Sequence, residues 1–82
     1  MKHDRLVEET QQLLDDVARK CLRALVTEDL DQQQTRRLAK FCFGCMNQKH
    51  ELPGRVEQHG YRAVAQVLRF VEAALLAIEG QE

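Results

Sequence analysis

The stretch GYRAVAQVLRFVEAALLAI, residues 60–78, is the longest apolar-rich segment of the chain and decides how the rest must be arranged. Its large apolar residues recur every three or four positions, at Tyr61, Val64, Leu68, Val71, Leu75 and Ile78. This spacing predicts a helix over 61–79. A second apolar set lies beside the first and consists of Val67, Phe70, Ala74 and Ala77. A helix that is apolar over so much of its circumference must be covered from more than one side.

Two further segments have the amphipathic pattern needed to cover that helix. The first helix is predicted over 4–26, with Asp4 as a suitable N-cap. The second is predicted over 32–46, where Asp31 and Gln34 have the spacing of a capping box. The inner stripes expected are Leu6, Leu13, Val17, Cys21 and Leu25 in the first helix, and Leu38, Phe41, Cys42 and Cys45 in the second.

The segment NQKHELPG, residues 47–54, carries the strongest turn signal in the chain. Pro53 lacks a backbone N–H and Gly54 disfavours a helix, so we expect a loop over 47–54. Residues 54–59 then form either a short helix or the opening of the last one, with a break at Gly60. No alternation long enough for a strand is present. The sequence therefore predicts one all-α domain over 1–82, a small three- to four-helix bundle.

The chain has 82 residues and a net charge of −1, but that charge is unevenly distributed. Residues 1–31 hold eight acidic and five basic side chains, whereas residues 32–62 hold six basic and two acidic ones. The six basic residues are Arg36, Arg37, Lys40, Lys49, Arg55 and Arg62. Such a segment can attract an acidic protein, or can contact nucleic-acid phosphates without reading the sequence. A simpler interpretation is a solvated helix face.

Cys42 and Cys45 form a C-x-x-C pattern. Redox activity is disfavoured because these thiols lie late in the predicted helix, where the helix dipole opposes a thiolate. A zinc site would need Cys42 and Cys45 with His50 and with His59 or Cys21, a spacing that fits no compact zinc finger. Small buried thiols that pack between helices are the simplest interpretation.

No residue pattern typical of an enzyme is present, and we expect no catalytic residue and no cofactor. The acidic side chains of the first helix lie on its polar face, and no glycine-rich phosphate loop occurs. A helix-turn-helix is also disfavoured, because its recognition helix would be 71–79, which has two acidic residues and no basic one. The N-terminus lacks the apolar core of a signal peptide, and three cysteines without a disulfide scaffold favour the cytoplasm.

The sequence thus favours a non-enzymatic helical protein-interaction module. It would act as a regulator, an adaptor or an inhibitor, such as one encoded by a phage or another mobile element. We expect a homodimer, because a chain this short buries only a modest core. The expected self-association residues are Leu68, Val71, Leu75 and Ile78, and the six basic residues are expected to bind the partner. Two alternatives stay open: a dimeric nucleic-acid-associated transcriptional regulator and a zinc-stabilised module.

Overall fold

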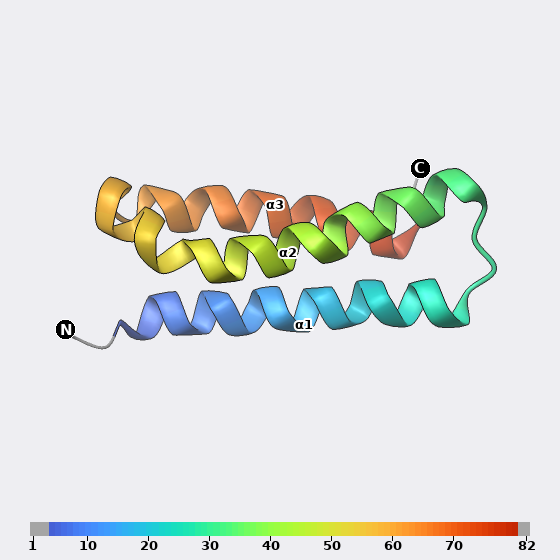
Figure 1. Cartoon of the computed structure of the whole chain (residues 1–82), viewed down its shortest axis with the longest axis horizontal. Coiled ribbons are helices and arrows are strands. Elements are labelled where there is room, and N and C mark those ends of the chain that lie inside the picture. The colour runs from blue at the N-terminus through green and yellow to red at the C-terminus, as the bar shows by residue number, and fades with distance from the viewer. Residues whose placement is uncertain (1–3, 81–82) are drawn as a thin grey trace.

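The computed structural model describes residues 4–80 and contains three helices. They are α1 (Arg5–Thr27), α2 (Gln32–His59) and α3 (Arg62–Glu79). The chain runs up, down and up again, so α2 is antiparallel to both of its neighbours (Figure 1). No strand occurs in the described part of the chain, which confirms the all-α prediction. The predicted limits of the first and third helices are correct to within one residue.

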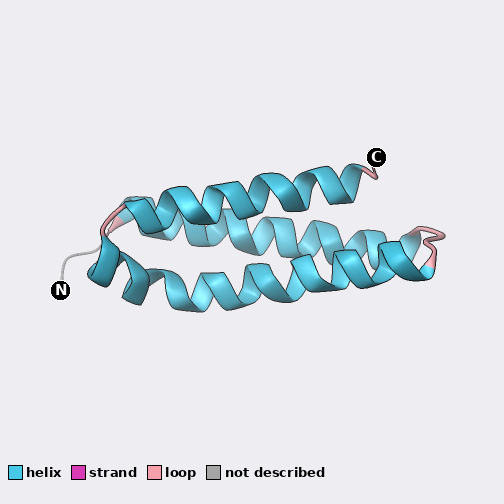
Figure 2. Ribbon diagram, turned by 90° about the horizontal axis from the view of Figure 1, so that it is seen from above, coloured by secondary structure: helices cyan, strands magenta, loops and turns pink. Residues whose placement is uncertain are grey.

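The bundle is a rod of about 45 × 19 × 15 Å. Its helices do not lie in one plane, so each of them contacts the other two (Figures 1 and 2). Within residues 4–80, no helix is both long and apolar enough to cross a membrane.

Local capping signals fix the helix ends where the sequence predicts them. The Asp4 carboxylate accepts hydrogen bonds from the Leu6 and Val7 backbone N–H groups, at 3.0 and 3.2 Å. Asp31 and Gln34 form the expected capping box at the start of α2. Gly60 ends α2 with φ 71° and ψ −162°, a conformation that is essentially restricted to glycine. The break predicted at Gly60 is confirmed.

The buried stripe of α1 shares Val17 and Cys21 with the predicted one and differs from it at Leu6, Leu13 and Leu25. It consists of Val7, Thr10, Leu14, Val17, Ala18, Cys21 and Ala24. Leu6 is exposed, and Leu13 and Leu25 are only half-buried. The Thr10 hydroxyl donates to the Leu6 carbonyl at 2.8 Å. This bond satisfies the polar group that Thr10 brings into the core.

The loop predicted over 47–54 is wrong, and so are the end of the second helix at 46 and the separate short helix near 54–59. α2 continues without interruption to His59 and contains Pro53 in its interior. Pro53 has no N–H to donate to the Lys49 carbonyl four residues earlier, so that carbonyl loses its helical partner. The Gln11 side-chain amide of α1 donates to this carbonyl instead, at 2.8 Å. Leu52, just before the proline, is fully buried and anchors the segment in the core.

α3 packs closely on α2 at a glycine. A Cβ atom added to Gly44 would come within 2.5 Å of the Phe70 ring, so the ring occupies space that any other residue would fill. Phe70 also contacts Phe41, with ring centroids 5.4 Å apart and planes tilted by 55°. This tilted arrangement is a favourable geometry for an aromatic pair. Gly44 therefore serves helix packing, although it weakens α2 locally.

Candidate protein-binding surfaces

The six basic residues expected to bind a partner do not form one patch. Arg36, Arg37, Lys40 and Arg62 are exposed. Lys49 instead turns toward α1, where its ammonium group lies 3.4 Å from the Asp15 carboxylate. Arg55 is half-buried and donates to the Gln66 side chain at 2.9 Å. What remains together is the group at the start of α2, Arg36, Arg37 and Lys40.

The structure does not bring the zinc candidates together. Cys45 is fully buried and Cys42 is half-buried, whereas His50 and His59 are exposed. Among residues 4–80, no group of three or more His, Cys, Asp or Glu side chains is arranged to hold a metal ion. The geometry of the candidate residues therefore does not fit zinc.

The cysteines instead pack between α1 and α2, and all three are unpaired. The Cys42 thiol donates to the Ala18 carbonyl of α1 at 3.6 Å. Burial, with a smaller effect of the neighbouring thiols, raises the pKa of Cys21 to about 11 and that of Cys45 to about 12. Both thiols stay protonated at neutral pH, and a protonated thiol is a poor nucleophile.

The four residues expected to mediate self-association have different environments. Val71 is 4% exposed and belongs to the core of the monomer, so its side chain is not available on the surface. Leu68 is 44% exposed, whereas Leu75 and Ile78 are half-buried. The difference arises because the buried face of α3 is centred on Val67, Val71 and Ala74. Leu68 and Leu75 lie at the α1 side of that face.

A shallow apolar hollow of about 250 Å³ lies between α1 and α2. Its lining residues are Ala18, Leu22, Cys42 and Met46, with Asp15 and Arg19 at the margin. Phe43 precedes Met46 by three positions on α2 and is 68% exposed, and Leu22 is 54% exposed. Val26, one turn beyond Leu22, is 75% exposed. We call Leu22, Val26, Phe43 and Met46 the α1/α2 apolar surface.

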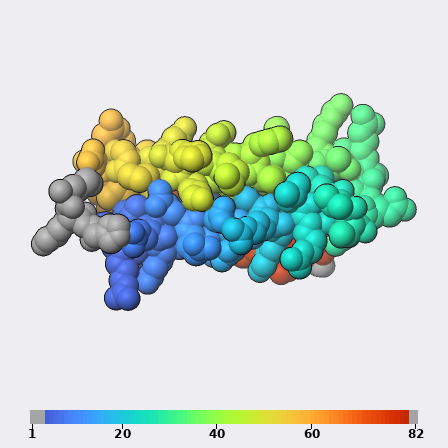
Figure 3. All heavy atoms as spheres, turned by 60° about the horizontal axis from the view of Figure 1, so that its bottom comes forward, coloured from blue at the N-terminus to red at the C-terminus, as the bar shows by residue number. Residues whose placement is uncertain are grey.

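A second hollow, of about 330 Å³, lies between α1 and α3. Leu13, Val17 and Leu75 form its apolar part. Its charged margin comes from α1 and consists of Asp16, Arg19, Lys20 and Arg23. Figure 3 looks onto α1, with α2 along its upper side and the end of α3 visible below. The first hollow therefore lies on the α2 side of α1 and the second on the α3 side, and Arg19 is at the margin of both.

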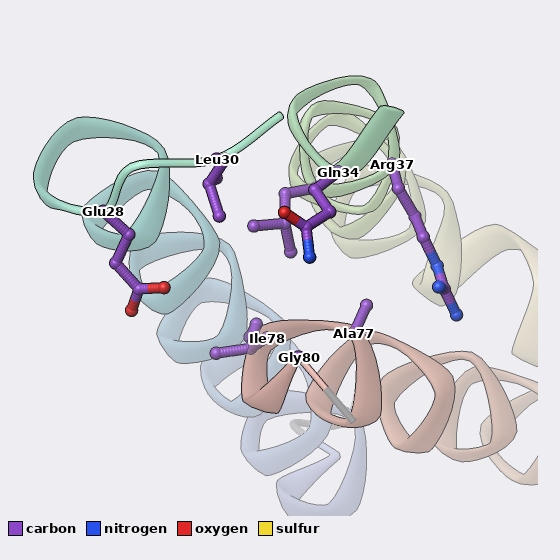
Figure 4. Close-up of a pocket in the computed structure, with 8 residues that line it drawn as sticks. Glu28, Leu30, Gln34, Arg37, Ala77, Ile78 and Gly80 are labelled. Atoms are coloured by element: carbon purple, nitrogen blue, oxygen red, sulfur yellow. The ribbon is translucent and has the colours of Figure 1, made fainter. Parts of the chain in front are cut away.

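A third depression lies at the end of the bundle, where the α1–α2 loop meets the end of α3 (Figure 4). Leu30, Ala77 and Ile78 line it together with the polar side chains Glu28 and Gln34. Its volume is only about 90 Å³. Pockets for small-molecule ligands usually measure about 300–1,000 Å³, so this depression is too small for such a ligand.

No family model matches the chain, and no curated protein or solved structure is significantly similar to it. Function is therefore inferred from the surfaces themselves. Helical spacing in the sequence identified Leu68 and Leu75 but not Phe43 or Leu22. Phe43 lies within the C-x-x-C pattern, next to Cys42, which is expected to be buried. Its position one residue after Cys42 places it on the outer side of α2, and helical spacing alone contains that signal.

Proposed function

We propose that this chain is a non-enzymatic helical interaction protein that binds a helix of a target protein across α1 and α2. The observation that supports this most directly is the α1/α2 apolar surface, where Leu22, Val26 and Phe43 are each more than half exposed. Scattered single apolar residues are ordinary on protein surfaces, but here Leu22 and Met46 line one hollow. Val26 is one turn from Leu22 along α1, and Phe43 is three residues from Met46 along α2. Amphipathic helices bind in such grooves through anchors spaced three or four residues apart.

The charges around this surface define the chemistry of the target. Arg36 and Lys40 precede Phe43 by seven and three positions and therefore lie on the same side of α2. Arg19 lines the hollow itself. The acidic residue that lines the hollow, Asp15, is already paired with Arg19 at 3.0 Å and with Lys49 at 3.4 Å. The surface is thus positively charged, and it suits a target helix whose apolar stripe is flanked by Asp and Glu.

Occupation of such a helix would make the chain a regulator, inhibitor or adaptor, because binding blocks or bridges the target and requires no reaction. We infer a cytoplasmic location, since two buried unpaired thiols suit a reducing compartment. Binding of this kind needs no cofactor.

The second candidate function is nucleic-acid association, favoured by the exposed group Arg36, Arg37 and Lys40. These side chains could contact phosphates, which gives binding that weakens steeply with salt and does not depend on base sequence. It is the weaker candidate, because it leaves the exposed Phe43 and Leu22 without a role.

The test is affinity capture from the native host, followed by direct binding of the captured protein to purified variants. We expect Phe43→Ser and the double variant Arg36→Glu/Lys40→Glu to lose binding by roughly tenfold or more, because each removes an anchor or reverses the steering charge. Leu76→Ser is the matched control, since Leu76 is an exposed leucine of α3 away from this surface. It should bind like the wild type.

A captured protein that binds Phe43→Ser as tightly as wild type would overturn the proposal. Loss of binding by Leu76→Ser alone would contradict it as well. A parallel titration with duplex DNA at low salt tests the alternative. Tight, salt-sensitive DNA binding that Phe43→Ser retains and Arg36→Glu/Lys40→Glu loses would replace protein binding with nucleic-acid association.

A further inference from the structure

The α3 side of α1 carries a second surface with a different pattern. Its residues follow the same three-and-four spacing as a helix stripe and are Leu6, Glu9, Leu13, Asp16, Lys20 and Arg23. Four of them, Leu13, Asp16, Lys20 and Arg23, line the hollow that α1 shares with Leu75 of α3. We propose that a second copy of this chain docks here, with its α1 antiparallel to the first. Self-association then uses a face other than the one proposed for the target.

Apolar residues of α1 and α3 form the middle of this surface. Leu6 and Leu68 are each 44% exposed, and Leu13 and Leu75 are half-buried at the hollow. Leu13 and Leu75 pack against the core on one side, whereas Leu6 and Leu68 lie outside it. Their partial exposure leaves apolar area that a docked helix pair would remove from water.

The register between α1 and α3 shows how these leucines would pair. The Tyr61 hydroxyl donates to the Asp4 carboxylate, which brings together positions 57 apart in the chain. α1 and α3 run in the same direction (Figure 1). The same offset of 57 residues sets Leu68 near the level of position 11 of α1 and Leu75 near that of position 18, and Leu75 lines the hollow with Val17 and Arg19. Along the axis of α1, positions 11 and 18 are equally far from a point midway between Leu13 and Asp16. A two-fold axis at that point therefore places Leu68 opposite Leu75 of the second copy.

One pair of α1 charges suits the same axis. Along the stripe, Glu9 and Asp16 come first and Lys20 and Arg23 follow. A two-fold axis between Leu13 and Asp16 places Glu9 opposite Lys20 of the second copy, and symmetry makes that pair twice. The same axis sets Leu13 opposite Asp16 and Leu6 opposite Arg23, so Glu9–Lys20 is the oppositely charged pair within this stripe. A parallel arrangement would instead set Glu9 against Glu9 and Lys20 against Lys20. The segregation of charge along α1 thus favours an antiparallel copy of the same chain over a parallel one.

The surface area of the monomer agrees with this occupant. The chain exposes 6041 Å², whereas a compact monomer of its 9.5 kDa mass exposes about 5,000 Å². The excess is comparable to the roughly 800 Å² that each partner buries in an interface of standard size. Lateral docking of two rods is a direct way to bury it.

Sedimentation over a dilution series tests the proposal with two charge reversals. Glu9→Lys and Lys20→Glu should each raise the dimer dissociation constant roughly tenfold or more, because each replaces two attractive pairs by two repulsive ones. An equimolar mixture of the two variants should recover a dimer of near wild-type affinity. In that heterodimer, each of the two symmetry-related contacts again joins a lysine of one copy to a glutamate of the other. Glu57→Lys, the same charge change on the exposed surface of α2, should leave the dissociation constant unchanged.

A monomer at every concentration would overturn the proposal. So would a dimer that ignores both reversals. That result is the signature of parallel helices, because each reversal there only exchanges one like-charge pair for another. Circular dichroism of each variant confirms that the fold is kept. Phe43→Ser should leave dimerisation unchanged, so failure of the dimer and failure of target binding are separate results.

Discussion

Local sequence and tertiary packing agree in the first half of α2, residues 32–46, and conflict in its second half, residues 47–59. A capping box starts the first half, and Leu38 and Cys45 lie where helical spacing predicts buried residues. The second half contains Pro53 and Gly54, and yet it is helical to His59. The difference shows that a proline is tolerated inside a helix when another element supplies the hydrogen bond that it removes.

Two contacts supply that support. The Gln11 amide bonds to the Lys49 carbonyl, and the buried Leu52 attaches the segment to the core. Leu52 continues the stripe of Leu38 and Cys45 at the same spacing of seven residues. The second half is therefore expected to depend on its contacts with the rest of the bundle, whereas the first half has local signals of its own.

The largest expected effect is that of Leu52→Ala. Removal of a fully buried leucine leaves a cavity and should lower the free energy of unfolding by about 2–5 kcal/mol. Urea denaturation of Leu52→Ala and of Leu38→Ala measures the two halves of α2 against each other. Glu51→Ala, at the exposed neighbouring position, serves as the control. A cost below about 1 kcal/mol for Leu52→Ala would mean that residues 47–54 behave as a surface loop.

Gln11→Leu should have the next largest effect. It leaves the Lys49 carbonyl without a donor, at a cost of about 1–3 kcal/mol, nearer the lower value because Lys49 is partly exposed. Pro53→Ala returns a backbone N–H to that carbonyl. In the Pro53→Ala background, Gln11→Leu should therefore cost much less. A double-mutant cycle by urea denaturation measures this coupling, and additive effects would show that the amide does not compensate for the proline.

These contacts also explain which part of the fold was predictable from sequence. The helix ends were predictable because their capping hydrogen bonds are local. Each of these bonds joins Asp4, Asp31 or Gly60 to a residue no more than four positions away. Gln11 and Lys49 are 38 residues apart, and no local pattern links them. The stripe of α1 was misplaced for a similar reason, because its buried side is set by contacts with α2 and α3, which lie far along the chain.

The candidate surfaces were predictable only in part. Leu68 and Leu75 were identified because they continue the apolar spacing of residues 61–78. Lys49 and Arg55 were grouped with the other basic residues because sequence proximity does not show that one faces Asp15 and the other Gln66. The exposure of Phe43 follows from its angle on α2, which becomes meaningful once the buried side of that helix is known.

Alanine substitutions at the two glycines of α2 should have smaller effects on stability, and the two effects should differ in sign. Gly54 has no atom within 4 Å of an added Cβ, so Gly54→Ala should stabilise the protein by about 1 kcal/mol through helix propensity. Gly44→Ala gains the same propensity but pushes the added methyl group into the Phe70 ring. Overpacking of this kind costs about 1–3 kcal/mol, so the net effect should be neutral to destabilising. Thermal denaturation compares the two variants, and equal stabilisation by both would show that the ring moves freely.

The smallest effect concerns the contact that attaches the end of α2 to the start of α1. Tyr61 follows Gly60 directly, and its hydroxyl donates to the Asp4 carboxylate at 2.7 Å. This bond, followed by the bonds from the Val7 and Leu6 N–H groups, holds the pKa of Asp4 below its ordinary value of 3.8. The same bond, followed by the Asp4 charge, raises the pKa of Tyr61 above its ordinary value of 10.0.

These two shifts give the contact a defined pH window. The folded Asp4 binds fewer protons than the unfolded one, so its contribution to stability is present above pH 3.8 and is lost as the pH falls through the lowered pKa. Tyr61 retains its proton more firmly when folded, so its contribution is lost as the pH rises above 10.0 through the raised pKa. The stability gap between wild type and Tyr61→Phe should thus be widest between these limits. Urea denaturation across pH measures this stability gap. In an Asp4→Asn background, position 4 has no carboxylate to protonate, so the gap should no longer narrow at acid pH. A gap that stays constant as the pH falls from neutral to well below 3.8 would show that the hydroxyl does not act through the carboxylate.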